Sequence, residues 1–382
     1  MGEVKIREAK EYVGMKVVYI GNYNDGTGWG NACLNNILAL HTAGVNVVPR
    51  AITFNDSDTT SNKIVAQLED QSERGADVCI QHTLPSLYHC NKSIKNIGVF
   101  YTETSTFSES MWQKYVNLMD EAWVANSQMV QASLASGVKI PIEICPLPIE
   151  LENYSDAKDC ANVGEFDGCF NFCFIGEFVK RKNLESLLRA YHTEFHPSEP
   201  VNLFLKLSMP NIDSEQALGV FDNFSQSVRA GLKIRKDYRK EIAITGMLEQ
   251  RHLISLMSKT DCFVMPSYGE AWCIPALESM ALGVPVIHTQ GTGMDDFCSG
   301  WSVQSRSTRC YLANDSLDNV YTSLTSWQEI DIEALASTMR IAYETYKNDK
   351  HEWNKMKEMA KQKAQNYSIQ KIGQKMKELL DG

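Results

Sequence analysis

The stretch from Lys16 to Gly44, KVVYIGNYNDGTGWGNACLNNILALHTAG, decides the fold class of this chain. The β-branched run Lys16–Ile20 predicts a strand, which breaks into the glycine-rich segment Gly21–Gly30. Apolar residues then recur at helical spacing over Ala32–Ala43, and the glycine that follows ends this predicted helix. Val45–Thr53 predicts the next strand. The stretch is therefore a βαβ unit, whose crossover should be right-handed.

The same alternation of strand and helix continues through the first half of the chain. Further apolar runs predict strands at Asp77–Gln81, Ile97–Tyr101, Glu121–Ala125 and Ile142–Cys145, with helices at Ser110–Met119 and Ser127–Ser136. The runs are continuous rather than alternating, which is typical of a parallel sheet that is covered on both faces. The first half is predicted to be Rossmann-like.

A second set of strands and helices follows a segment without periodicity, Pro146–Gly168, which we expect to be a linker. Strands are predicted at Phe170–Ile175, Val201–Leu207, Ile242–Thr245, Cys262–Met265 and Val284–His288. Helices are predicted at Leu184–Phe195, Val220–Ala230, Arg251–Ser258, Pro275–Leu282, Glu352–Ala364 and Ser368–Leu380.

The length of 382 residues also favours two domains. The predicted fold class is α/β, with two Rossmann-like, doubly wound parallel-sheet domains that face each other across a cleft. We expect the N-terminal domain at residues 1–150, the linker at 151–168 and the C-terminal domain at 169–365. The last helix, residues 366–382, should cross back to the N-terminal domain.

Composition excludes several classes of partner. The chain has a net charge of −10 and an isoelectric point near 5.4, so it is negatively charged at neutral pH. It should repel polyanions, and nucleic acid is therefore not an expected partner. No apolar run of 18 residues occurs and the N-terminus lacks a signal-peptide pattern, so any membrane contact should be peripheral. The eleven cysteines are scattered without paired C-x-x-C spacing, which indicates reduced thiols and a cytoplasmic location.

The loop Met265–Glu278, MPSYGEAWCIPALE, carries the strongest functional signal. It holds a strand end, a turn, Glu270, Pro275 at a plausible first helical turn, and Glu278 inside the helix. Open α/β sheets bind ligands beyond the carboxyl ends of their strands. A helix N-terminus there can bind a diphosphate, and the two carboxylates can accept hydrogen bonds from hydroxyl groups.

Together with Ser279–Ile287, SMALGVPVI, this loop resembles the E-x7-E signature of family-4-type retaining glycosyltransferases, the glycosyl transferases group 1, which have the GT-B fold. In that family the first glutamate contacts the transferred sugar, the loop N–H groups hold the sugar and phosphates, and the second glutamate binds ribose. The resemblance implies a catalytic Glu270. It implies donor-binding roles for Trp272, Cys273, Ile274 and Glu278.

The loop departs from the family pattern at Ala271 and Cys273, where glycines are frequent, so the backbone has less room to approach a donor. Trp272 has an equally good interpretation as a core aromatic residue.

Gly176–Asn183, GEFVKRKN, resembles the family's G-R-x4-K segment, in which arginine and lysine neutralise the donor diphosphate in place of a metal. The resemblance implies that Gly176 binds the donor and that Lys182 takes the catalytic lysine position. An acid, Glu177, stands at the arginine position. We expect it to point away, with Lys180 or Arg181 as the second cation.

Three weaker resemblances complete the predicted site. The turn Gly246, Met247 and Leu248 matches the loop that flanks the nucleobase. The loop Gly26–Gly30 implies donor contacts from Gly28 and Trp29, although it fails the dinucleotide fingerprint and could be a mobile turn. Glu103 stands where the family has a catalytic histidine and could orient an acceptor or sugar hydroxyl. His82 is an alternative cleft residue.

The resemblance implies a retaining transferase that moves a hexose from a UDP- or GDP-sugar to a glycan or other hydroxyl acceptor, in polysaccharide or glycoconjugate biosynthesis. The acceptor should bind the N-terminal domain and the donor the C-terminal domain. No cofactor and no metal are expected, and the D-x-D match Asp56–Asp58 is discounted because it lies in a polar loop. Alternatives are a nucleotide-sugar epimerase or phosphorylase on the same fold, or a catalytically silent glycan- or nucleotide-binding protein.

Overall fold

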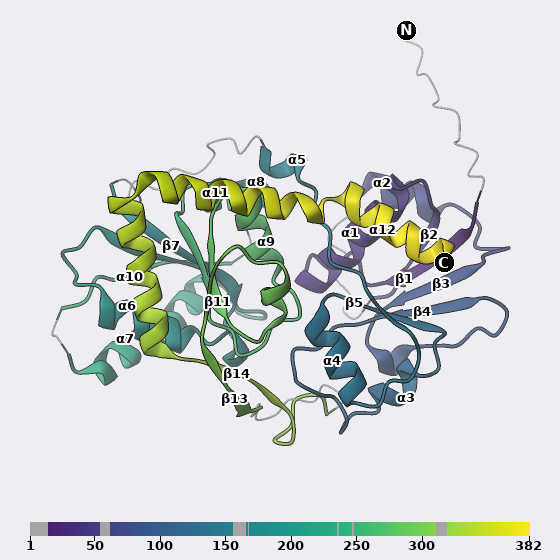
Figure 1. Cartoon of the computed structure of the whole chain (residues 1–382), viewed down its shortest axis with the longest axis horizontal. Helices are drawn as coiled ribbons and strands as arrows, with labels where there is room; N and C mark the ends of the chain where they lie inside the picture. The colour runs from purple at the N-terminus through teal and green to yellow at the C-terminus, as the bar shows by residue number, and fades with distance from the viewer. Residues whose placement is uncertain are drawn as a thin grey trace, which may run out of the picture.

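Two parallel sheets of six strands each organise the computed structural model of the chain (Figure 1). The first has the order β2-β1-β3-β4-β5-β6 and the second β12-β11-β10-β7-β8-β9. Their strands are β1 (Lys16–Gly21), β2 (Asn46–Ala51), β3 (Val78–His82), β4 (Lys95–Val99), β5 (Glu121–Val124), β6 (Ile142–Ile144), β7 (Phe170–Glu177), β8 (Val201–Ser208), β9 (Ile242–Thr245), β10 (Cys262–Met265), β11 (Val286–Thr289) and β12 (Gly300–Val303). The structure describes residues 14–53, 62–155, 166, 168–234, 237–246, 248–310 and 319–382.

Helices connect the strands and cover both sheets. They are α1 (Gly28–Thr42), α2 (Lys63–Glu69), α3 (Trp112–Val116), α4 (Ser127–Ala135), α5 (Glu152–Ser155), α6 (Leu184–Glu194), α7 (Ser214–Leu232), α8 (Gln250–Ser258), α9 (Ile274–Ala281), α10 (Ile332–Asn348), α11 (Lys350–Ala364) and α12 (Ile369–Asp381). Several begin at a side chain that accepts a hydrogen bond from the first turn, such as Thr27, Asn126, Asp213 and Ser368. None of the described helices is long and apolar enough to cross a membrane.

Burial explains why the strand sequences are continuous apolar runs. Every residue of β3 and of β10 is buried, as are the first six residues of β7. A strand in a parallel sheet with helices on both faces has no solvent side, so apolar residues are favoured at successive positions. The buried polar residues Gln81 and Asn171 are hydrogen-bonded. The predicted fold class is confirmed in this respect.

The boundaries of two predicted helices were wrong. The helix predicted over Ser110–Met119 is the short α3, because Ser110 accepts a hydrogen bond from the Trp112 N–H at 2.9 Å and so lies before the helix. In contrast, α7 is longer than the predicted Val220–Ala230, because Asp213 caps its true start.

Helix α10 and an antiparallel hairpin, β13 (Ser305–Arg309) and β14 (Ser326–Ile330), were not predicted. The hairpin strands are mostly polar, SRSTR and SWQEI, so their sequences lack the apolar run that marked the other strands.

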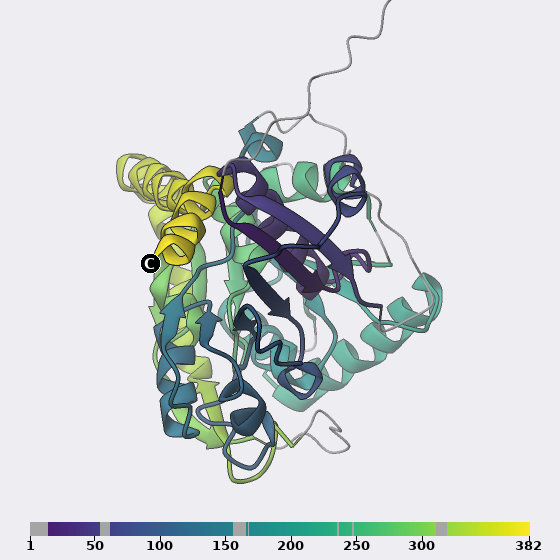
Figure 2. The same cartoon turned by 90° about the vertical axis from the view of Figure 1, so that its right-hand side faces the viewer.

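The chain ends against the first sheet's helices. Figure 1 shows α11 running along the half that contains β7 and β11, while α12 continues over the half that contains β1. Figure 2, turned by 90°, again places α12 beside α1, and the two helices are in contact. A Cβ on Gly373 would lie 2.2 Å from the Ala39 carbonyl oxygen, so only glycine permits this approach. Ile369, Ile372 and Met376 of α12 are buried in the same contact.

Candidate active site

The carboxylate of Glu270 is the centre of a buried ionic cluster at the carboxyl end of β10. Its Oε1 atom lies 2.7 Å from Lys182 Nζ and 3.1 Å from Arg181 Nη1. Ser267 donates a third hydrogen bond, at 2.7 Å. The two cations come from the short 3-10 helix Lys180–Lys182, which follows β7, the neighbour of β10. Parallel neighbours bring both loops to one edge of the sheet, as the sequence motifs predicted.

The charges in this cluster stabilise one another. Burial by itself would raise the pKa of Glu270, but Lys182 and Arg181 outweigh it and hold the pKa below its usual value. Burial opposes protonation of Arg181, yet Glu103 and Glu270 raise the pKa of its guanidinium. Glu270 is thus ionised, and Arg181 is a permanent cation.

Glu103 faces this cluster from the other half of the molecule. Its Oε1 atom lies 3.4 Å from Arg181 Nη2, and Tyr321 donates a hydrogen bond to the other carboxylate oxygen. The backbone is equally close, because a Cβ on Gly269 would lie 2.4 Å from the Glu103 carbonyl oxygen. Glycine at 269 therefore allows the two halves to meet beside Glu270.

Further contacts hold the halves together around the Glu270 loop. Asn126 donates to the Ala271 carbonyl oxygen, and the Ser127 N–H and hydroxyl each donate to Asp296 at 2.7 Å. The Ser105 N–H donates to the Ser326 carbonyl oxygen at 2.8 Å. The Glu270 loop thus lies where the two halves of the molecule meet, in contact with the start of α4 and with β14.

The start of α9 has an unusual backbone. Cys273, immediately before the helix, has φ +81° and ψ +77°, in the left-handed region that favours glycine. Cys273 was expected to leave the backbone less room to approach a donor than glycine would. The structure adds that its backbone is also strained. Pro275 occupies the first helical turn as predicted, with Ile274 as the first helical residue.

The side chain of Trp272 lies in the core. It stacks on Phe297 with a ring-centroid distance of 4.3 Å and contacts Tyr367 edge-on at 5.3 Å. Of the two interpretations of Trp272, the core aromatic one is confirmed for the side chain. Its Nε1 atom is buried without a hydrogen-bond partner among the described residues.

Glu278 projects from α9 to the predicted linker. Tyr154, in α5, donates a hydrogen bond to its carboxylate at 2.6 Å. Burial raises the pKa of Glu278, and the bond from Tyr154 offsets part of that shift. Glu270 is buried and Glu278 is half-buried, and only Glu270 has cationic partners among the contacts of the described residues.

Gly176 and Glu177 end β7. The Glu177 side chain is exposed, but it is near enough to Arg181 to help raise the pKa of that guanidinium, so its pointing away from a diphosphate stays a prediction. A Cβ on Gly176 would meet the ring of Phe174 at 3.2 Å and Lys182 Cδ at 3.7 Å. Because Gly176 has no side chain, there is space beside Lys182.

The structure describes two of the three residues of the turn Gly246–Leu248, which the sequence predicts to flank a nucleobase. Gly246 has φ +83°, and a Cβ there would lie 2.2 Å from Ser214 Oγ. Leu248 is half-buried against the core. Met247 lies outside the described residues, as does the D-x-D match Asp56–Asp58. Within the described ranges, no three His, Cys, Asp or Glu residues are grouped as they would be to hold a metal.

The glycine loop after β1 is held in place by Asp25. Its carboxylate accepts hydrogen bonds from the Thr27 N–H at 2.9 Å and from the Thr27 hydroxyl at 2.8 Å. Thr27 in turn caps α1, which begins at Gly28. Trp29 packs against His82, at the carboxyl edge of the first sheet.

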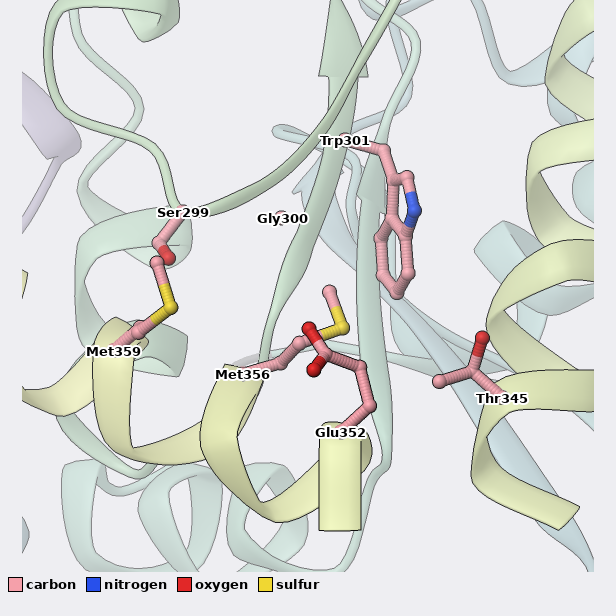
Figure 3. Close-up of a pocket in the computed structure, with 7 residues that line it drawn as sticks. All are labelled: Ser299, Gly300, Trp301, Thr345, Glu352, Met356 and Met359. Atoms are coloured by element: carbon pink, nitrogen blue, oxygen red, sulfur yellow. The ribbon is translucent and has the colours of Figure 1, made fainter. Parts of the chain in front are cut away.

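A shallow pocket of the described surface lies elsewhere, between β12, α10 and α11 (Figure 3). It is lined by Ser299, Gly300, Trp301, Thr345, Glu352, Met356 and Met359. None of the predicted site residues lines it.

Four residues that contact the site were missed by sequence reasoning: Ser267, Tyr321, Tyr154 and Asn126. Ser267 lies three residues before Glu270, within the motif loop, and could have been found there. The others are separated from their partners by more than a hundred residues. No local pattern could have paired them.

Comparison with known proteins agrees with this geometry. Residues 232–302, which include Glu270 and Glu278, match the family model described as glycosyl transferases group 1. A curated relative, the uncharacterized glycosyltransferase 335 of Sulfolobus islandicus rod-shaped virus 1, is 24% identical over 199 residues. That match covers 52% of this chain and 53% of the relative, so about half the length of each is compared.

Solved structures share the whole fold at low identity. The sucrose-phosphate synthase of Thermosynechococcus elongatus has a TM-score of 0.65 at 14% identity, over 96% of this chain and 98% of that one. HepE of Anabaena, in complex with UDP and glucose, has a TM-score of 0.65 at 12% identity, over 96% and 100%. The trehalose-6-phosphate synthase OtsA has a TM-score of 0.66 at 11% identity, over 96% and 99%.

The two facing parallel sheets define a GT-B protein. Its resemblance to the glycosyl transferases group 1, which the sequence predicted, is confirmed.

Proposed function

We propose that this chain is a retaining glycosyltransferase that moves a hexose from a nucleotide-sugar donor to a hydroxyl acceptor. The observation that carries the proposal is the cluster of Glu270 with Lys182 and Arg181 at the carboxyl edge of the second sheet. It combines a fixed carboxylate for sugar hydroxyls with two cations for a diphosphate, in front of the N-terminus of α9.

UDP-glucose is the donor class that we propose first. HepE, which shares the fold, was solved in complex with UDP-glucose, at a TM-score of 0.64 and 14% identity. The match to glycosyl transferases group 1 covers the segment that contains both glutamates and the nucleobase turn.

In the proposed complex, Lys182 and Arg181 bind the diphosphate and stabilise the charge that develops as it leaves. Glu270 accepts hydrogen bonds from the transferred sugar. Glu278, which now accepts from Tyr154 at 2.6 Å, binds the ribose. Because the two cations supply the positive charge, transfer requires no metal ion.

The guanidinium of Arg181 cannot keep its ion pair with Glu103 and also bind a diphosphate fully. When phosphate takes the guanidinium, Glu103 is released to face the acceptor and orient its hydroxyl. The departing phosphate accepts the acceptor's proton on the same face of the sugar, which retains the configuration. The acceptor lies on residues 1–150, and the donor on residues 169–365 beyond the linker 151–168.

The test is release of nucleoside diphosphate from a panel of UDP-, GDP- and ADP-sugars, with and without hydroxyl acceptors and in EDTA. We expect turnover with at least one donor in EDTA and its loss in Glu270→Gln. Glu185→Gln on the exposed face of α6 is the matched control and should leave turnover unchanged.

Each alternative predicts a different result in this assay. Interconversion of the sugar without release of nucleotide would identify an epimerase, and release that needs inorganic phosphate would identify a phosphorylase. Binding without turnover for every donor would favour a silent binding protein. Each of these outcomes contradicts the transferase.

A further inference from the structure

Three aromatic side chains form a cluster at the carboxyl edge of the first sheet; Trp29, His82 and Tyr101 are named the aromatic cluster below. Trp29 lies in the first turn of α1, His82 ends β3, and Tyr101 follows β4. Strand β3 pairs with both β1 and β4, so the three side chains leave the same edge of the sheet. The ring centroids are 5.0 Å apart for Trp29 and Tyr101, 5.1 Å for His82 and Tyr101, and 5.7 Å for Trp29 and His82.

Each member of the cluster has a buried polar atom without a partner. Within the described part of the chain, Trp29 Nε1, His82 Nε2 and the Tyr101 hydroxyl have no hydrogen bond, nor has the neighbouring Thr83 hydroxyl. Native proteins leave few buried polar groups unsatisfied, because each one loses its hydrogen bonds to water without replacement. Several such atoms side by side indicate that a ligand supplies the missing partners.

The hydrogen-bond pattern defines what these atoms offer. Asn36 Nδ2 donates to the Tyr19 hydroxyl at 3.1 Å, and that hydroxyl lies 2.6 Å from His82 Nδ1. With Tyr19 donating to Nδ1, the proton of neutral His82 is at Nε2. The cluster then presents N–H donors from His82 and Trp29, and from Tyr101 a hydroxyl that donates and accepts.

Among the described residues, no charged side chain is a named cause of the pKa shifts of His82 and Tyr101. Burial alone lowers the pKa of His82, to about 3, so the imidazole is neutral at physiological pH. The pKa of Tyr101 is raised by burial and then by Cys33, Cys145 and Tyr88, none of which is a cation. An anionic ligand would lose its hydration without gaining a counter-ion. Hydroxyl groups, in contrast, match these neutral donors and acceptors.

We propose that the aromatic cluster is the acceptor subsite and that it binds an uncharged polyhydroxylated molecule, a neutral sugar rather than a sugar phosphate or acid. The proposal rests on the proposed transferase activity. Tyr101 is two residues from Glu103, which contacts Arg181 and, through it, Glu270.

A ligand would reach the cluster from the side of Trp29, which is only half-buried. A Cβ on Gly26 or on Gly28, in the loop before it, would meet nothing within 4 Å, so there is free space beside the loop.

The first test needs no ligand. If the Tyr101 hydroxyl serves a ligand, Tyr101→Phe removes an unsatisfied buried group and leaves the thermal unfolding midpoint at or above that of the wild type. A fall of several degrees would show that the hydroxyl stabilises the fold and would overturn the proposal. Tyr191→Phe is the contrasting control, because its buried hydroxyl donates to the Val201 carbonyl oxygen at 2.8 Å and its loss should lower the midpoint.

The second test measures acceptor use with UDP-glucose as donor. Methyl glycosides of glucose, mannose, galactose and N-acetylglucosamine are compared with glucose 6-phosphate and glucuronate. We expect a neutral glycoside to accelerate UDP release and the two anions not to do so. Tyr101→Phe should raise the KM for that glycoside about fivefold, because one hydrogen bond to it is lost. The KM for UDP-glucose should change less than about twofold.

Preferential use of the anions, or an unchanged glycoside KM in Tyr101→Phe, would overturn the subsite and leave the transferase intact. If no donor turns over, saturation-transfer NMR with the same glycosides and UDP decides the subsite separately. Glycoside signals that weaken in Tyr101→Phe support it, and the absence of any glycoside signal contradicts it. Failure of the subsite is thus distinguished from failure of the transferase.

Discussion

Lys182 Nζ lies 2.7 Å from Glu270 Oε1, and the two side chains are only 14% and 5% exposed. Nearly all of this ion pair is removed from water, so each charge depends on the other for compensation. The same pair joins the two motifs that the sequence singled out, 88 residues apart. The cluster is therefore both a structural feature and the proposed donor site.

The coupling between these charges is measurable as stability. Lys182→Met and Glu270→Gln each leave a buried charge without its nearest partner, at a cost of about 3 kcal/mol. The double variant removes both charges, so we expect its loss of unfolding free energy to be about 1 to 2 kcal/mol smaller than the sum of the two single losses. Urea unfolding of the four proteins gives the coupling energy. The exposed pair Arg189 and Glu185, 2.7 Å apart in α6, is the control and should couple by less than about 0.5 kcal/mol. Additive effects at Lys182 and Glu270 would contradict a buried pair.

Glu103 should compete with a diphosphate for Arg181. Replacing it by glutamine removes the negative charge 3.4 Å from the guanidinium while keeping the size of the side chain. We expect Glu103→Gln to bind UDP about fivefold more tightly, which is about 1 kcal/mol. The rate of sugar transfer should fall, because the carboxylate that orients the acceptor hydroxyl is gone. Isothermal titration with UDP and steady-state kinetics measure the two effects. Glu109→Gln, exposed in the same half, is the control. Weaker UDP binding by Glu103→Gln would show that the carboxylate supports the cation instead.

Sequence alone could predict what depends on local patterns. The run Lys16–Gly44 predicts the βαβ unit, because the apolar run of a buried strand and the apolar periodicity of a helix are both visible in neighbouring residues. The Glu270 loop and the Lys182 segment could be placed at one sheet edge, because both follow strands. Tyr321 could not be placed. It is 218 residues from Glu103 and follows a polar stretch without periodicity, so only the tertiary fold brings the two together.

Cys273 should carry a measurable backbone penalty. Its φ of +81° is in the left-handed region, where a Cβ costs about 1 to 2 kcal/mol relative to glycine. Cys273→Gly and Cys273→Ala both remove the buried sulfur, but only the glycine variant removes the Cβ. We therefore expect the glycine variant to be more stable than the alanine variant by about 1 kcal/mol. Their free energies of unfolding in urea provide the comparison. Equal stabilities would mean that the backbone relaxes at no cost.

Asp261 should make stability depend on pH. It precedes β10, and its carboxylate accepts a hydrogen bond from the Asn171 N–H at 2.8 Å. Burial raises its pKa to about 6, although that hydrogen bond offsets part of the shift. Because the folded state binds this proton more tightly than the unfolded state, the contribution of Asp261 is greatest at low pH. It is lost as the pH rises from about 4 to about 6.

Asp261→Asn keeps the shape and the acceptor oxygen but does not titrate. The variant should therefore unfold at a higher temperature than the wild type above pH 6, and this advantage should shrink as the pH falls towards 4. Thermal unfolding at pH 4, 5, 6 and 7.5 measures the difference. Asp381→Asn, at the exposed end of α12, is the matched control and should show no such trend. A difference between Asp261→Asn and the wild type that does not change with pH would mean that the carboxylate titrates alike in the folded and unfolded chains.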